Sequence, residues 1–352
     1  MRTVTVSPAI LLLPAVLLLT ATAAAGQVFE SVGVRALGMG GAFVAVADDG
    51  TATYWNPAGL ATGAIVDFCA SHAEGDRLAA LGESGAGGEA AARSFCLAMP
   101  AIGLSYNRLR ATTALPARSS TGAGPADRQD LRPREVGVSS LVATQLGVTL
   151  VQTLAPGLVL GTTLKAVRAS FAAGDRPPGS GLEAALSHAR ELAGRSETVF
   201  DADLGLMAVG GPVRVGLTVR NLREPGFESA SGDEATLARQ ARLGVAITPG
   251  RHAATYATDP SGLIVAVDVD LTRTPTPLGD RRNVAVGVER WWAGRRLGIR
   301  AGARASVVDR ARTVATVGAS VGIVRGVYVE AAITRGHRDG DRGWAVGMRA
   351  GF

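Results

Sequence analysis

Apolar and polar residues alternate with a period of two through most of this chain. The stretch 213–220 reads VRVGLTVR, 263–270 reads LIVAVDVD, and 297–304 reads LGIRAGAR. This period places successive side chains on opposite faces of a β-strand, with one face apolar and the other polar. The pattern predicts an all-β protein, although a soluble sandwich and a membrane barrel both produce it.

The lengths of the connections separate these two architectures. Short breaks alternate with long loops along the chain, as they do in outer-membrane barrels, where the turns on one side are short and the loops on the other are long. The connection 249–261 is an exception, because its place in the series calls for a short turn. We therefore predict a transmembrane antiparallel β-barrel over residues 64–352, with about fourteen strands near 64–71, 93–99, 101–110, 135–152, 158–170, 198–209, 213–222, 239–248, 262–271, 282–292, 296–306, 312–324, 327–335 and 343–352.

Residues 1–25 have the features of a secretory signal peptide. Arg2 supplies a positive charge, an apolar core runs over 10–19, and small residues at 23–25 offer a cleavage site. No later window of about 18 apolar residues could form a membrane-spanning helix. An exported chain with barrel-like alternation is expected in the outer membrane of a Gram-negative-type bacterium, in contact with its lipid.

The stretch 34–60, VRALGMGGAFVAVADDGTATYWNPAGL, lies between this leader and the first predicted strand. Pro57 fixes its own φ and disfavours a helical conformation at Asn56, whose side chain can bond nearby backbone groups, so that a fixed turn is expected. The glycines lack the third position and the preceding strand of a dinucleotide-binding loop. They are better suited to close approach between backbone segments.

This stretch, followed by a barrel, resembles the hatch of the FadL/PorV-type outer-membrane β-barrels. That family contains transporters of hydrophobic compounds and PorV-type relatives. A weaker resemblance to the PorV-type branch lies at 219–222, VRNL, which is followed by Glu224 and Pro225. The resemblance implies that residues 26–63 fold inside the barrel as a plug, with a hatch motif of Gly38, Gly40, Gly41, Asn56, Pro57, Ala58 and Gly59.

The last predicted strand alternates up to the terminal Phe352, with Trp344 on the same face. This ending resembles the insertion signal read by the outer-membrane assembly machinery, which is therefore an expected partner. Aromatic residues make up only 5 % of the chain, so the interfacial girdles of the barrel should be thin. The candidates for them are Trp291, Trp292, Tyr328, Trp344 and Phe352.

Charged residues on the polar faces of the strands predict a polar lumen rather than a catalytic site. They are Asp201, Asp203, Arg214, Arg220, Asp268, Asp270, Arg300 and Arg304. The four histidines fall in predicted loops without metal-site spacing, and no serine nucleophile motif is present. We therefore expect no enzyme activity, metal or cofactor. The net charge of +6 comes without a basic run interleaved with aromatics, so no nucleic-acid partner is expected.

Two further local features are a pair of cysteines and a helical stretch in a loop. Cys69 and Cys96 lie on neighbouring predicted strands and could form a disulfide in an oxidising envelope or remain two packed thiols. The stretch 181–195 has apolar residues at helical spacing, which predicts a short helix in an outer loop.

Two functions remain open from the sequence. By resemblance, the barrel would transport hydrophobic small molecules such as long-chain fatty acids passively, with the plug as the moving element. Alternatively, it would be a PorV-like barrel that binds secreted or surface proteins. The alternation and the hatch motif do not identify the cargo.

Overall fold

The computed structural model describes residues 32–78, 87–116, 136–176, 181–249, 262–308, 312–336 and 341–352. The predicted leader, residues 1–25, lies outside these described residues. Between them the seven ranges contain a closed antiparallel barrel, a segment that fills part of its lumen, and two small outer elements.

Fourteen strands form the barrel, and each is hydrogen-bonded to two neighbours around the closed wall. The predicted all-β barrel is therefore confirmed, and the predicted strands match these in order. The strands are β1 Asp67–Leu78, β2 Gly87–Ala98, β3 Ile102–Pro116, β4 Val136–Ala155, β5 Leu158–Arg176, β6 Ser196–Gly210, β7 Val213–Arg220, β10 Gln240–Ile247, β11 Leu263–Asp270, β12 Asn283–Trp292, β13 Leu297–Ser306, β14 Thr313–Val324, β15 Val327–Gly336 and β16 Asp341–Gly351.

Closure occurs between the first and last strands. β1 pairs with β16 in continuous antiparallel register from Asp67 opposite Gly351 to Arg77 opposite Asp341. Backbone hydrogen bonds of 3.2 and 2.9 Å between Val66 and Phe352 extend this seam by one more pair. The wall is therefore sealed at the end where β1 begins and the chain ends, which we call the periplasmic end.

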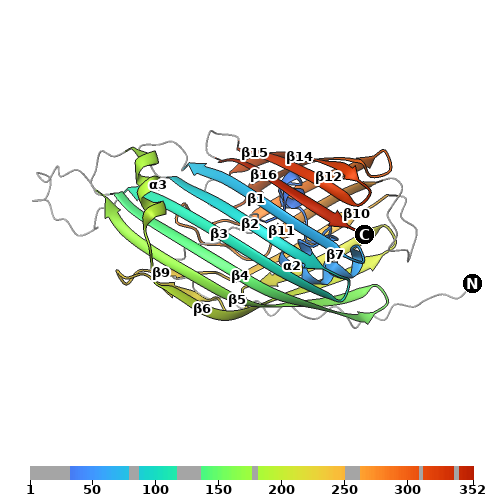
Figure 1. The fold of residues 1–352 in the computed structure, drawn as a ribbon, viewed down its shortest axis with the longest axis horizontal. Coiled ribbons are helices and arrows are strands. Elements are labelled where there is room, and N and C mark those ends of the chain that lie inside the picture. Colours follow the sequence, from blue (N-terminus) through green and yellow to red (C-terminus); the bar gives the residue numbers. More distant parts are fainter. Residues whose placement is uncertain are drawn as a thin grey trace, which may run out of the picture.

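The opposite, outer end carries the longer loops and the longer strands. In Figure 1, β3 to β6 extend to the end where helix α3 lies, while the C-terminus lies toward the other end. Helix α3, Leu182–Glu191, confirms the predicted loop helix, and its Ala185 and Leu186 pack with Ala114 and Val138 of the wall.

A hairpin that the sequence did not suggest lies between β7 and β10. Its strands are β8, Gly226–Glu228, and β9, Glu234–Thr236. Phe227 and Leu237 are buried against a cluster that includes Val167 on the lumenal face of β5. The outer half of the lumen is therefore partly covered by a folded loop.

The outward faces of most strands are mainly apolar. Leu146, Leu164 and Phe200 are 61, 57 and 69 % exposed, and Val and Ile side chains continue this surface on β10 to β15. Apolar side chains facing outward on a closed barrel are what a bilayer requires, because closure satisfies every backbone group within the wall. The barrel is an outer-membrane barrel. Among the described residues, no helix is long and apolar enough to cross a membrane.

Three expectations about individual residues are corrected. Trp291 is only 4 % exposed, and Tyr328 lies 5.3 Å from it, so both rings face the lumen instead of forming an interfacial girdle. His72 lies in β1 rather than in a loop, because β1 extends to Leu78, beyond its predicted end at 71, whereas His188 lies in α3, within the predicted loop helix. The other two histidines, His252 and His337, lie outside the described residues.

The segment 32–63, called the plug below, fills the periplasmic half of the lumen. It contains helix α1, Val34–Gly38, helix α2, Ala52–Trp55, and the 3-10 helix η2, Pro57–Thr62. Every residue from 32 to 60 except Asp48 is buried. In Figure 1 these blue helices lie inside the barrel wall. Phe43 and Trp55 form the centre of the largest apolar cluster, with their rings 5.8 Å apart.

Candidate functional site

The Asn-Pro-Ala turn fixes the plug to one side of the barrel wall. The Asn56 side chain accepts a hydrogen bond from the Ala58 backbone N–H at 3.2 Å, as expected for a turn set by asparagine and proline. Its amide also donates to the Val44 carbonyl at 2.9 Å and to the Leu206 carbonyl of β6 at 3.2 Å. One fully buried side chain therefore joins the turn, another part of the plug and the wall.

Two lumenal glycines of the wall make room for this turn. A Cβ atom added at Gly161 of β5 would lie 2.2 Å from backbone atoms of Pro57 and Ala58. A Cβ atom at Gly205 of β6 would lie 2.2 Å from the Asn56 side-chain oxygen. Strand glycines therefore mark where the plug backbone contacts the wall.

The glycines of the hatch motif serve the same close packing. Gly40 and Gly41 adopt φ values of 71° and 88°, which are strained for other residues. A Cβ atom at Gly40 would lie 2.8 Å from the backbone nitrogen of Ala303 in β13. Gly38, Gly40, Gly41, Asn56, Pro57, Ala58 and Gly59 are all buried within the lumen. Their role in moving the plug remains a prediction.

Arg35 of α1 is the main ionic link between the plug and the wall, and the sequence analysis did not identify it. Its guanidinium donates two hydrogen bonds, of 2.6 and 2.7 Å, to the carboxylate of Glu289 on β12. It also pairs with Asp48 and Asp49 of the plug. Arg35 is 2 % exposed and Glu289 is fully buried, so water cannot replace these contacts while the plug is seated.

The charges in this network control the ionisation of its plug members. Burial raises the pKa of the Asp48 carboxyl, but the charges of Arg35 and Arg214 outweigh that effect and hold the pKa well below its ordinary value. Burial lowers the pKa of Arg35, but Asp48 and Glu289 raise it by more. Both groups are therefore charged at neutral pH.

These shifts predict how plug seating depends on pH. Because the pKa of Asp48 is lowered in the folded state, its stabilising effect is complete above its unfolded pKa of about 3.9. It is lost as the pH falls below that value. We expect the protection of plug amides that depends on Asp48, measured as the difference in hydrogen exchange between wild type and Asp48→Asn, to be constant from pH 8 to 5 and to disappear progressively below pH 4. Asp48→Asn should remove part of this acid dependence, and an identical profile in the variant would contradict the assignment.

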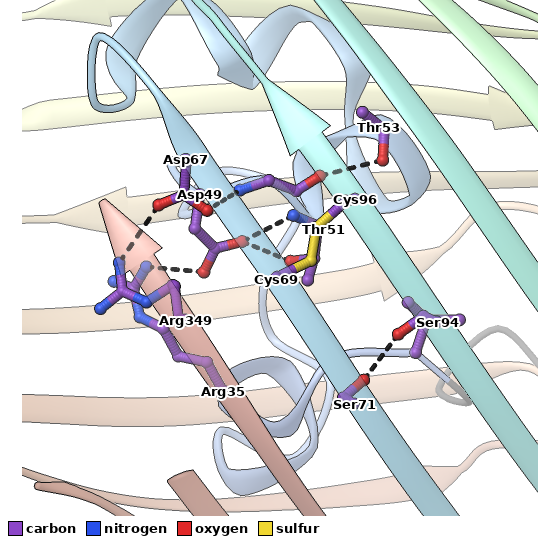
Figure 2. Close-up of a disulfide and its surroundings, with 12 residues drawn as sticks. Arg35, Asp49, Thr51, Thr53, Asp67, Cys69, Ser71, Ser94, Cys96 and Arg349 are labelled. Carbon is purple, nitrogen blue, oxygen red and sulfur yellow. Dashed lines mark hydrogen bonds and ion pairs between the residues drawn. A yellow bond between two sulfur atoms is a disulfide. The ribbon is translucent and has the colours of Figure 1, made fainter. Parts of the chain in front are cut away.

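The ionic network continues from Glu289 around the wall. Arg300 lies 3.7 Å from Glu289 and 3.8 Å from Glu330, and Arg349 lies 3.7 Å from Glu330 and 3.8 Å from Asp67. Figure 2 shows where this chain reaches the plug, with Arg349 beside Asp67 and Arg35 beside Asp49. Asp67 also accepts a hydrogen bond of 2.8 Å from the Gly50 backbone N–H of the plug.

The predicted polar residues of β11 and β13 all face the lumen. Both oxygens of Asp268 face the plug side of β11, and its Oδ2 accepts backbone hydrogen bonds of 2.8 Å from Phe43 and Val44. Asp270 pairs at 2.6 Å with Arg242, which the prediction did not include. Arg300 belongs to the Glu289 network, whereas Arg304 lines a cavity above the plug.

The predicted polar residues of β6 and β7 converge on the only lysine in the chain. Lys165 lies 2.6 Å from Asp203 and 3.2 Å from Asp201, and all three side chains are buried. Arg220 lies 3.7 Å from Asp203, and its guanidinium stacks 3.5 Å from the ring centroid of Tyr54 in the plug. The remaining residue, Arg214, donates to the Val46 carbonyl of the plug at 3.4 Å. Lys165 was not among the predicted lumen residues, because its carboxylate partners lie on the neighbouring strand.

Cys69 and Cys96 form a disulfide across β1 and β2, which resolves the alternatives left open by the sequence. They are direct register partners, with their Cα atoms 5.0 Å apart, and both are buried on the lumenal face. Figure 2 shows the disulfide beside the plug residue Thr51 and near Asp67. A Cβ atom on Gly50 would lie 2.6 Å from the Cys96 sulfur, so the disulfide also forms part of the plug's seat.

Removing this disulfide should lower barrel stability without changing its fold. The crosslink spans 27 residues, and loops of this size typically contribute about 2–4 kcal/mol. We expect the Cys69→Ala/Cys96→Ala variant to unfold at a lower temperature, measured by the loss of the folded-barrel band in unheated gels. Reductant should shift the wild type towards the variant and leave the variant unchanged. Equal stability of the two would contradict a bonded pair.

The two residues of the predicted insertion signal face outward at the end of the barrel seam. Trp344 and Phe352 are 43 and 66 % exposed. Their recognition by the assembly machinery remains a prediction. In the described part of the chain, no three His, Cys, Asp or Glu side chains are grouped so as to hold a metal ion.

Two cavities lie in the outer half of the lumen, above the plug. The larger, of about 60 Å³, is lined by Leu37 of the plug and by small wall residues such as Ala73, Ala92 and Ala345. The smaller, of about 30 Å³, lies beneath Pro277 and Leu278 of the β11–β12 loop. Ala90 lines both, so the two cavities lie next to each other, one under the outer loops and one on the plug.

Comparison with known proteins adds a family and a fold. The family model described as "F plasmid transfer operon, TraF, protein" matches residues 75–259, a little over half of the chain. The chain belongs to this TraF family. The matched region runs from within β1 through β10, so it covers the wall around the outer hairpin and α3 rather than the plug. A search of curated protein sequences finds no match.

Solved structures with the same fold confirm the FadL-type barrel predicted from the sequence. The CymD monoaromatic hydrocarbon channel has a TM-score of 0.61 and 13 % identity, over 92 % of this chain and 98 % of that one. The toluene transporter TbuX of Ralstonia pickettii has a TM-score of 0.59 at 13 % identity, over 92 and 99 % of the two chains. A FadL homologue of Pseudomonas aeruginosa has a TM-score of 0.56 at 12 % identity, over 91 and 98 %.

Proposed function

We propose that this TraF-family barrel lets small hydrophobic molecules cross the outer membrane passively. The carrying observation is a pair of neighbouring cavities, one under Leu278 in the outer loops and one against Leu37 of the plug. The shared fold with channels named for toluene and other monoaromatic hydrocarbons supports this proposal. Binding and diffusion require no chemistry from the protein, so we propose no enzymatic step.

Passage requires the plug or its neighbours to move. Each cavity is smaller than the roughly 150 Å³ of an apolar cavity that binds benzene. The wall is continuously paired at the periplasmic end, and the plug fills the lumen there. We infer that the plug is the moving element and that the contacts of Arg35 and Asn56 set the resistance to its movement.

The test is uptake of labelled toluene and of a labelled long-chain fatty acid into vesicles that contain the purified barrel. Wild-type protein should increase entry of at least one of these, and Leu37→Arg, which places a charge in the cavity, should reduce it. Vesicles that contain a barrel lacking residues 32–63 are the control for leakage through an open lumen. Uptake by the wild type that does not exceed that of protein-free vesicles would exclude transport of these two compounds.

A second candidate function is binding of secreted or surface proteins at the outer end. It is favoured by the charge-filled inner lumen around Glu289 and Asp203, which opposes passage of an apolar molecule. Membership in a family named for a plasmid transfer operon is compatible with such a role. Affinity capture from the native envelope, with α3 exchanged for a glycine-serine linker as the control, should recover a partner only with the intact outer end.

A further inference from the structure

The outward faces of β1, β2 and β3 carry a group of charges in a wall that is otherwise mostly apolar, with other outward-facing arginines at Arg168, Arg290, Arg335 and Arg342. Glu74 and Asp76 on β1 alternate with the lumenal Ser71 and Ala73, and the Glu74 side chain is 51 % exposed. Arg108 and Arg110 on β3 likewise alternate with the buried Asn107 and Leu109. Glu74 and Asp76 therefore lie two strands away from Arg108 and Arg110, with Glu89 and Arg93 on the outward face of β2 between them.

Glu74, Arg93 and Arg108 lie five to seven residues from the periplasmic ends of their strands, within the height of the bilayer. On β2, outward-facing Arg93 is only five residues from the periplasmic end of the strand at Ala98. On β5, the first outward-facing charge, Arg168, is ten residues from the corresponding end at Leu158. The outward-facing side chains of β11 and β14 carry no charge along their whole length. An arginine facing lipid near mid-bilayer costs about 2–4 kcal/mol, so a group of them is unfavourable against lipid alone.

The basic side chains also have no ion-pair partner among the residues that the structure describes. Arg93 and Arg108 are direct register partners across β2 and β3, an arrangement in which like charges repel. Over the described ranges, neither of them nor Arg110 forms an ion pair, in contrast to Arg35 and Arg242 in the lumen. The acidic strand is only partly compensated, since Glu74 contacts His72 at 3.1 Å and Asp76 is in register with Arg342.

A second copy related by two-fold symmetry places opposite charges against both strands, β1 and β3, at once. Two copies of a membrane protein related by a two-fold axis along the membrane normal place β1 of one copy opposite β3 of the other, with β2 at the axis. An acidic strand then faces a basic strand twice, as in a self-complementary isologous interface. Closer to the periplasmic end, Phe95 and Tyr106, with rings 6.0 Å apart, supply apolar contact area on the same face.

We propose that a second copy of this chain covers this face, with Glu74 and Asp76 of each copy opposite Arg108 and Arg110 of the other. The charged side chains of this interface lie on the outward face of the wall, away from the plug. The interface also removes this charged part of the wall from lipid. The resulting dimer leaves both outer ends and both periplasmic ends free.

Charge reversal tests the proposal, because a mixture of two reversed variants should restore the association that each variant alone loses. The variant Glu74→Arg/Asp76→Arg has a mainly basic face, and Arg108→Glu/Arg110→Glu has a mainly acidic one. Each alone should self-associate in lipid bilayers at least about 10-fold more weakly than wild type. An equimolar mixture should associate again, because each variant now complements the other. Association is measured by energy transfer between labelled copies, and barrel folding by gel mobility before and after heating.

Cysteine crosslinking locates the contact independently. Ala91→Cys lies on the outward face of β2 between the two charged strands and should crosslink copy to copy in the native envelope. Ala319→Cys, on the outward face of β14, is the matched control and should not. A wild type that stays monomeric in bilayers, or a mixture of reversal variants that fails to associate, would overturn the proposal. Crosslinks from position 91 that reach only a different protein or lipid would overturn it as well.

Discussion

Replacing Arg35 with methionine is expected to unseat the plug while leaving the barrel folded. The substitution leaves Glu289 fully buried without its bidentate partner and removes the counter-charge of Asp49. Removing one member of a buried ion pair typically costs about 3–5 kcal/mol, because the remaining charge stays desolvated. Hydrogen exchange of plug amides should therefore accelerate by roughly two to three orders of magnitude. Single-channel conductance should rise as the lumen becomes accessible.

An exposed ion pair supplies the matched control. Arg190 of α3 donates two hydrogen bonds to Glu89, but its side chain is 43 % exposed, so Arg190→Met should change stability by less than about 1 kcal/mol. Adding Glu289→Met to Arg35→Met should recover part of the lost protection, because it removes the orphaned charge. Plug exchange in Arg35→Met at the wild-type rate would show that packing alone holds the plug.

The barrel could be predicted because its constraints are local. The period of two sets which side chains face lipid, and the alternation of loop lengths sets the up-and-down order. The predicted strands therefore match the observed strands in their order along the chain. Even the long connection after β10 did not alter the order of strands in the wall. The hairpin β8–β9 was missed because each strand has only three residues, which is too short for a periodic signal.

The contacts within the lumen could not be predicted in the same way. Arg35 and Glu289 are 254 residues apart, and only barrel closure with the plug inside brings them together. A single arginine in an otherwise apolar, glycine-rich stretch was a usable signal, since such a charge needs a buried partner. Trp291 was misplaced because neighbouring tryptophans at 291 and 292 face opposite sides of the wall, and composition does not indicate which one faces lipid.

The strand glycines connect the sequence of the barrel wall with the contacts inside the lumen. Gly205 and Gly216 lie on the lumenal faces of β6 and β7, where added Cβ atoms would contact Asn56. A strand that only faced lipid and water would gain stability from larger residues there. The sequence of the wall therefore encodes the position of the plug, and glycine-to-alanine changes can test that encoding one contact at a time.

Gly205→Ala is accordingly expected to loosen the plug at its Asn-Pro turn. The new methyl group would lie 2.2 Å from the Asn56 side-chain oxygen and 2.8 Å from Pro57 Cδ, so the turn must move away from β6. Overpacking of this kind costs about 1–3 kcal/mol, and the bond from Asn56 to the Leu206 carbonyl would be lost in addition. Amides of residues 56–62 should exchange faster than those near Arg35, because the second attachment is intact.

Gly210→Ala is the control on the same strand, since an added Cβ atom there meets nothing within 4 Å. It should leave both plug exchange and barrel mobility unchanged, because alanine and glycine then differ only in strand propensity. Equal effects of the two substitutions would mean that Gly205 acts through the strand and not through the plug. If Gly205→Ala loosens the turn and also increases hydrocarbon uptake, the Asn-Pro attachment limits passage. If it loosens the turn without increasing uptake, movement of the turn alone is insufficient and the Arg35 network must also open.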